Sequence, residues 1–137
     1  MAAMVARELS TARGPIRWLE AGEGRPLVLV HAFPLSGAMW RPQLERPPRG
    51  WRLVAPDLRG FRRPGAPDPG EPPDRLAIDD YAADIEALVD ALDGGGAVIG
   101  GLSMGGYVVL AMLRRARVRP AGLILADTRA EADSEEA

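Results

Sequence analysis

Three of the side chains that most often carry covalent chemistry are absent or almost absent from this chain. The 137 residues include no cysteine, no lysine and one histidine, so every basic side chain is an arginine. Without cysteine there is no disulfide, thiol nucleophile or thiolate metal site. Without lysine there is no Walker-type phosphate lysine, Schiff base or serine–lysine pair. These absences exclude several classes of enzyme and metal site.

A strong charge imbalance and long apolar runs are absent too. The net charge is −2, from 17 basic and 19 acidic residues, so no nucleic-acid-binding surface is indicated. No apolar run reaches the roughly 20 residues that span a membrane, and residues 1–8 lack the pattern of a signal peptide. Hydrophobic residues make up 47% of the chain, enough for one domain with a core. We expect a cytoplasmic protein without a nucleic-acid or membrane partner.

Strand-like and helix-like segments alternate along the sequence. The clearest helix is predicted over 78–92, where apolar residues recur at a spacing of 3.6. A second helix is expected over 107–116, and a helical turn over 39–44. Such alternation predicts an α/β fold, with a mainly parallel sheet and helices on both faces. The strands are expected at 16–20, 26–31, 52–57, around Val98 and at 121–127.

The most informative motif is the pentapeptide Gly101-Leu102-Ser103-Met104-Gly105, which has the pattern G-x-S-x-G. An apolar run precedes it and a helix-like run follows it. In that context the serine sits on a sharp strand-to-helix turn that lifts its hydroxyl clear of the sheet. Small neighbours are needed because the backbone is crowded there. The alternative interpretation is a glycine-rich turn with a bystander serine.

A second motif, Leu27-Val28-Leu29-Val30-His31-Ala32-Phe33-Pro34, reads as a buried strand running into a short loop. Together the two segments resemble the α/β-hydrolase family, in its esterase and enol-lactonase-like branch. The resemblance implies that Ser103 is the nucleophile and that the backbone N–H groups of Phe33 and Met104 form the oxyanion hole. Ala32 stands where the family usually has glycine, which costs strain if a positive φ is needed. The resemblance also implies a cis bond before Pro34.

A third segment, Asp57-Leu58-Arg59-Gly60-Phe61, adds to the resemblance. Many α/β-hydrolases continue this segment with Gly-x-Ser, whereas this chain continues with Arg62, Arg63 and Pro64. In the family the loop is structural, so we expect the departure to alter the shape of the loop and not the chemistry.

The base that a serine nucleophile needs is the missing part. The resemblance implies the chain order nucleophile, acid, histidine, but no histidine follows Ser103. His31 lies upstream, and we expect it to be structural and bonded to backbone. Asp127 is the candidate acid, with a capping or loop role as the alternative. The resemblance therefore predicts a single incomplete α/β-hydrolase domain over 1–137, with about five or six of eight strands, whose last strand leaves an apolar sheet edge.

These residues predict a serine hydrolase acting on a carboxylic ester or lactone, without cofactor or metal, and with little or no activity in the chain as given. Phe33, Met39, Trp40 and Met104 line an acyl pocket or pack in the core; the sequence supports both equally. A second hypothesis is a non-catalytic module that binds a partner or dimerises through its sheet edge. A dinucleotide-binding unit is disfavoured, because the glycines never form G-x-G-x-x-G.

Overall fold

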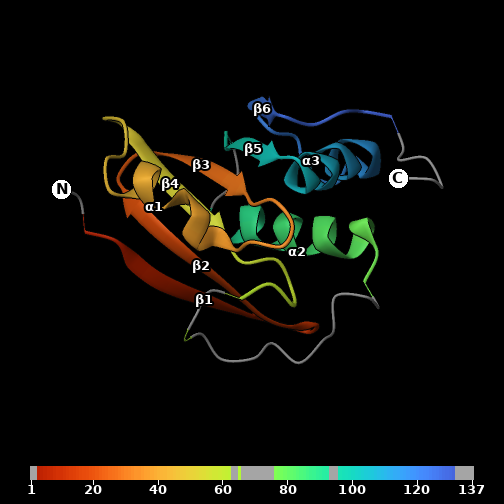
Figure 1. The fold of residues 1–137 in the computed structure, drawn as a ribbon, viewed down its shortest axis with the longest axis horizontal. Helices are drawn as coiled ribbons and strands as arrows, with labels where there is room; N and C mark the ends of the chain where they lie inside the picture. Colours follow the sequence, from red (N-terminus) through yellow and green to blue (C-terminus); the bar gives the residue numbers. More distant parts are fainter. Residues whose placement is uncertain (1–2, 63–64, 66–75, 93–95, 132–137) are drawn as a thin grey trace.

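The protein is described from a computed structural model, which covers residues 3–62, 65, 76–92 and 96–131. Within these residues, six strands form one sheet in the order β1-β2-β4-β3-β5-β6 (Figure 1). β3, β4, β5 and β6 run parallel, and β2 pairs antiparallel with β1 and β4. The mainly parallel sheet expected from the sequence is confirmed. The strands are β1 (Val5–Thr11), β2 (Gly14–Gly22), β3 (Arg25–Val30), β4 (Trp51–Pro56), β5 (Val98–Leu102) and β6 (Gly122–Ala126).

Helices cover both faces of this sheet, as predicted. On one face lie α2 (Ile78–Ala91) and α3 (Met104–Arg115), which pack beside each other (Figure 1). On the other face lie a short 3-10 helix (Gly37–Trp40) and α1 (Arg41–Leu44). Each face has its own apolar core, because successive side chains of a strand point to opposite sides. In β4, for example, Val54 packs in the core under α2 and α3, whereas Leu53 and Ala55 pack under α1.

The first strand, β1, was not predicted. Its sequence, Val-Ala-Arg-Glu-Leu-Ser-Thr, carries few apolar side chains, and most of its residues are exposed. The strand exists because it pairs along seven residues of β2, from Val5 opposite Glu20 to Thr11 opposite Gly14. Gly14 has a φ of 105°, which an L side chain rarely adopts, and it closes the turn between the two strands.

The segment after β4 is tied to two other parts of the fold through Arg59. The Arg59 guanidinium donates two hydrogen bonds of 3.1 Å to the Asp84 carboxylate on α2. It also donates to the backbone oxygen of Arg13 in the β1–β2 turn. Arg59 and Asp84 are both buried. One arginine therefore joins three elements on this side of the sheet. Arg62, in the part of the segment that departs from the family pattern, is exposed, and Arg63 lies outside the described residues.

In the described part of the chain, no helix has the length and apolar character needed to cross a membrane.

Candidate active site

Ser103 occupies the bend between β5 and α3. Its backbone angles are φ 53° and ψ −113°, a conformation that few L residues adopt. The side chain is exposed. Its hydroxyl does not cap α3 and makes no hydrogen bond to any residue that the structure describes. The sharp strand-to-helix turn expected from the pentapeptide is present, with the hydroxyl uncommitted at its apex.

Two glycines of the pentapeptide let the strand and the helix approach each other closely. A Cβ atom on Gly101 would lie 2.3 Å from the backbone oxygen of Gly105. A Cβ atom on Gly105 would lie 2.2 Å from the oxygen of Val30 and 2.9 Å from that of His31. The first turn of α3 therefore rests directly on the end of β3. This contact brings the serine turn and the loop after β3 together.

The segment after β6 holds the backbone of Ser103 from the other side. The Ser103 N–H donates to the Ala126 oxygen at 3.1 Å. The Thr128 hydroxyl donates to the Ser103 oxygen at 2.8 Å. Gly106 makes room for Thr128, because a Cβ there would lie 2.3 Å from the threonine hydroxyl oxygen. Sequence reasoning missed Thr128, since a threonine after a strand carries no distinctive pattern.

Asp127 lies between these two contacts. Its φ is 44°, which places the residue in the left-handed region, and it is exposed. Within the described residues its carboxylate makes no hydrogen bond to Ser103 or to His31. The structure thus brings the candidate acid to the strand end beside the serine turn, without a proton relay between them.

The loop after β3 and the first residue of α3 each contribute one backbone N–H group to the site. The Phe33–Pro34 bond is cis, as the resemblance implied. Ala32 does not have a positive φ, so alanine fits this position without strain. The N–H groups of Phe33 and Met104 donate to no residue in the described part of the chain. Both proposed oxyanion donors are therefore available to a ligand.

His31 cannot serve as a base for Ser103. The ring is fully buried. Its Nε2 accepts a hydrogen bond of 2.9 Å from the Leu58 N–H, so Nδ1 carries the proton and donates to the Ala32 oxygen at 2.9 Å. Burial lowers the pKa of the ring, partly opposed by the Ala32 hydrogen bond and the Asp57 charge. The expected structural role, with bonds to backbone, is confirmed.

The apolar residues proposed for an acyl pocket go to different places. Phe33 is 65% exposed, and its ring meets Phe61 edge-on at 5.6 Å. Met39 accepts a hydrogen bond on sulfur from the Ala32 N–H. Trp40 packs in the core under α1, on the opposite face of the sheet from α3. Core packing is therefore the better description of Trp40, whereas Phe33 is free to contact a ligand.

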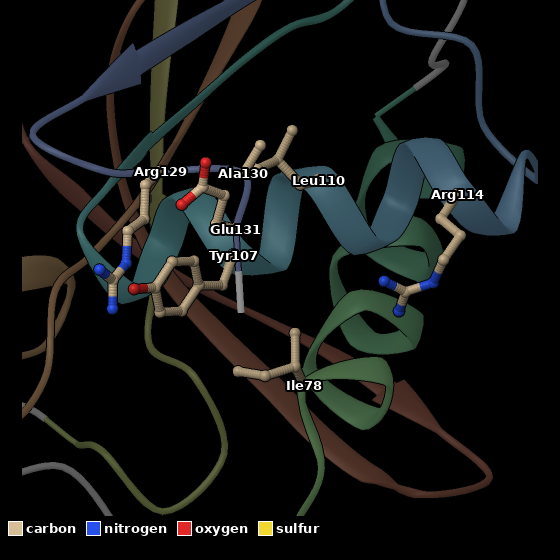
Figure 2. A pocket seen from close by; sticks show the side chains of 7 residues that line it. All are labelled: Ile78, Tyr107, Leu110, Arg114, Arg129, Ala130 and Glu131. Carbon is tan, nitrogen blue, oxygen red and sulfur yellow. The ribbon is translucent and has the colours of Figure 1, made fainter. Parts of the chain in front are cut away.

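A hollow of about 340 Å³ lies along α3, one helical turn beyond Ser103. Figure 2 shows Tyr107 and Arg129 at one end of this hollow and Arg114 at the other, with Ile78 of α2 below. Tyr107 follows Ser103 by four residues and so shares its side of the helix. The remaining lining residues are Leu110, Ala130 and Glu131. Among the described residues, no group of three histidines or carboxylates is placed to hold a metal ion.

The chain is similar to known proteins in both sequence and structure. A family model described as the alpha/beta hydrolase fold matches residues 25–136. A non-heme chloroperoxidase of Streptomyces lividans is 41% identical over 108 residues, which cover 76% of this chain and 37% of that protein. A solved thermophilic esterase of Thermogutta terrifontis superposes with a TM-score of 0.76 at 39% identity, over 96% of this chain and 48% of the esterase.

A third relative, the N-acyl homoserine lactonase AidH, superposes with a TM-score of 0.76 at 35% identity, over 92% of this chain and 46% of AidH. The chain therefore spans about half the length of these solved structures. The family model covers most of the chain, and the six-stranded, mainly parallel sheet with its helices fits this fold. The chain belongs to the α/β-hydrolase fold family.

Proposed function

We propose that this chain carries the nucleophile and the oxyanion-binding groups of a serine hydrolase that cleaves carboxylic esters or lactones. One observation carries the proposal. Ser103 is held in a strained conformation at the carboxyl end of β5, with an uncommitted hydroxyl. An esterase and a lactonase among the structural relatives support the substrate class.

In the proposed reaction, the Ser103 oxygen bonds to the substrate carbonyl carbon and its proton passes to a base. The carbonyl electron pair moves to the oxygen, which the N–H groups of Phe33 and Met104 stabilise. Collapse of this intermediate expels the alcohol oxygen, which takes the proton and leaves an acyl-serine. Water then attacks the acyl-serine in the same way, which releases the carboxylic acid and restores the Ser103 hydroxyl. Each backbone donor of this kind contributes a rate factor of about 100 or more.

The base for this reaction is not His31, whose two ring nitrogens are both committed to backbone. We therefore propose that the base comes from sequence that the longer relatives have and this chain lacks. Asp127 is the candidate acid. On this view residues 1–137 form an incomplete domain and hydrolyse esters very slowly or not at all.

Binding of phenylboronic acid tests the nucleophile without requiring turnover. The serine oxygen bonds to boron and its proton is released to water, which leaves a tetrahedral boronate anion that resembles the reaction intermediate. We expect saturable formation of tetrahedral boron in the ¹¹B NMR spectrum, and its loss in Ser103→Ala. Equal binding by the Ser103→Ala variant, or none by either protein, would overturn the assignment of Ser103.

Turnover of p-nitrophenyl acetate tests the missing base. We expect the chain to release p-nitrophenol no faster than its Ser103→Ala variant does. A serine-dependent burst, followed by steady release, would contradict the proposed inactivity and would show that a base is present within these residues.

A second candidate function is a self-associating module. Among the described residues β6 pairs only with β5, and Leu123, Ile124 and Leu125 are 38%, 47% and 46% exposed. Ile124 also borders an apolar groove of about 340 Å³ on the α1 side of the sheet. An open apolar edge can pair with the same edge of a second copy.

Size-exclusion chromatography at several concentrations tests this candidate. We expect one defined dimer that dissociates on dilution, and a monomer for Ile124→Lys, whose charge opposes edge pairing. Leu113→Lys is the matched control, because Leu113 is 39% exposed but lies on α3. A monomer at all concentrations, or a heterogeneous aggregate, would exclude a dimerising module.

The cytoplasmic location expected from the sequence remains part of the proposal, and fractionation of cells that produce the protein would test it.

A further inference from the structure

His31 is a fully buried titratable group beside the site, and the proposed reaction does not use it. It lies between two backbone segments, with Nε2 accepting from the Leu58 N–H and Nδ1 donating to the Ala32 oxygen, each at 2.9 Å. The Leu58 contact fixes the tautomer, because an acceptor nitrogen carries no proton. The ring therefore links the segment after β4 to the loop after β3 through one hydrogen bond to each.

The Ala32 carbonyl that His31 holds belongs to the same peptide unit as the Phe33 N–H. A trans peptide is planar, and its C=O and N–H bonds point in opposite directions. The Ala32 oxygen also accepts from the Leu35 N–H at 2.9 Å. Two donors thus fix the carbonyl on one side of the peptide, and the Phe33 N–H must point to the other side, where it has no partner among the described residues.

The far end of the same loop is tied to the same segment. The Gly37 N–H donates to the Asp57 carboxylate at 2.9 Å. A Cβ on Gly37 would lie 2.3 Å from the Ala55 oxygen, so this end of the loop packs tightly on β4. Asp57 and Leu58 together therefore hold both ends of the loop that carries the Phe33 N–H.

We propose that His31 is a positioning residue, which aims the Phe33 N–H at the substrate oxygen through the Ala32–Phe33 peptide. The role of the Phe33 N–H in binding the substrate oxygen rests on the proposed function. The link between His31 and the Ala32–Phe33 peptide rests on the hydrogen bonds described above. Protonation of His31 would replace the Nε2 acceptor with a second donor facing the Leu58 N–H. The Leu58–Nε2 hydrogen bond would break, so the ring would still donate from Nδ1 to the Ala32 oxygen but would no longer be anchored to the segment after β4. Asp57 is the charged group that favours protonation, and burial opposes it.

NMR of the intact chain tests the coupling, because the sequence has one histidine and hence one set of imidazole signals. We expect imidazole ¹⁵N shifts of the Nδ1–H tautomer at pH 7. On acidification, the Phe33 and Leu58 amide signals should move with the same midpoint as the His31 ring. A ring in the Nε2–H tautomer would overturn the inference. So would a Phe33 amide signal that does not shift as His31 titrates.

Two variants separate the hydrogen bond from the bulk of the ring. His31→Asn keeps a side-chain amide donor near the Nδ1 position, whereas His31→Leu has none. We expect phenylboronic acid to bind about tenfold more weakly to His31→Leu, since a donor is misdirected and not removed, and the asparagine variant to recover most of the loss. Equal weakening in both variants would indicate a merely structural role and would overturn the inference.

The outcomes of the two proposals can be told apart. Failure of the wild-type chain to bind the boronic acid would reject the role of Ser103, while the tautomer and the coupled titration would still decide the role of His31. If His31→Leu does not fold, the wild-type titration alone remains decisive.

Discussion

At the scale of single residues, Ser103 is one of three non-glycine residues in the described part of the chain that have a positive φ, and its neighbours hold it there. Its φ of 53° and ψ of −113° cost an L residue of order 1–3 kcal/mol. The Ser103 N–H and C=O are bonded to Ala126 and Thr128 on the far side of the turn. These contacts keep the residue in place at the cost of some stability.

Relief of that strain gives a prediction at this scale. Glycine adopts such angles freely, but it gives up about 0.4–1 kcal/mol because the unfolded chain becomes more flexible. We expect Ser103→Gly to raise the free energy of unfolding by about 1 kcal/mol, and Ser103→Ala to leave it nearly unchanged, since alanine keeps the strain. Urea denaturation of the three proteins measures the difference. Equal stabilities of the glycine and alanine variants would show that the turn stores no strain.

At this same scale the sequence was informative where the neighbours along the chain decide the structure. The bend at Ser103 follows from the flanking glycines, and the burial of His31 follows from the apolar strand before it. The hydrogen bonds from Ser103 to Ala126 and Thr128 could not be predicted, because they join residues more than twenty positions apart. The direction of the Phe33 N–H likewise depends on Leu58, on a different strand end.

Between elements, α3 makes a close backbone contact with the end of β3. Gly105 is the contact point, because a Cβ atom added to it would lie only 2.2 Å from the Val30 oxygen. That neighbour is backbone and cannot rotate away, so an added methyl group must push the helix off the strand. The position of the Ser103 turn relative to the Phe33 loop therefore depends on this glycine.

We expect Gly105→Ala to lower the free energy of unfolding by about 2 kcal/mol or more, as overpacking of a tight contact does. Gly122→Ala is the matched control, because its added Cβ would find its nearest neighbour at an ordinary 3.6 Å from Val98. The control should change stability by less than about 0.5 kcal/mol. Thermal unfolding followed by circular dichroism compares the two, and similar losses would contradict the close-contact argument.

The helix whose apolar residues recur at a regular spacing was predicted nearly to the residue. The strand that depends on hydrogen bonding to a neighbouring strand was not. α2 begins at Ile78 as expected and ends at Ala91, one residue before the expected end. α3 begins at Met104, three residues before the expected start, because the glycines that follow carry no apolar period. β1 was missed because its exposed, charged sequence forms a strand only beside β2.

For the whole molecule, the buried His31 links stability to pH. Burial makes the pKa of His31 lower in the folded protein than in the unfolded chain. Below pH about 6.5, the ordinary histidine pKa, the unfolded chain therefore binds more protons than the folded one. The free energy of unfolding must then fall as the pH is lowered from about 6.5, and this group has no effect above about pH 7.

Urea titrations between pH 7.5 and 5 measure this dependence. The lowered pKa of Glu20, which Arg52, Trp18 and Arg7 stabilise against burial, acts only at more acidic pH, so this window reports on His31. We expect His31→Asn to flatten the profile in this window. A wild-type profile that is already flat from pH 6.5 to 5 would contradict the burial of a neutral ring.

The order of the six strands was not derivable from periodicity, because it depends on pairing between distant segments. Resemblance supplied the family, and the alternation of elements supplied the parallel sheet with helices on both faces. Neither indicated that Arg59 would tie the segment after β4 to α2 and to the β1–β2 turn. That arrangement exists only once three separate elements have come together.

The hydrogen bonds that Ala126 and Thr128 form with the Ser103 backbone matter for any attempt to graft the serine turn into another protein. The glycines at positions 101 and 105 permit the bend, but the hydrogen bonds that hold the Ser103 backbone come from Ala126 and Thr128, outside the pentapeptide. Grafted into another strand-to-helix junction without a following strand, the same pentapeptide would lose both hydrogen bonds that hold Ser103 in its strained conformation. The backbone conformation of Ser103 thus depends on three consecutive elements, and a designed protein would need β5, α3 and β6 together.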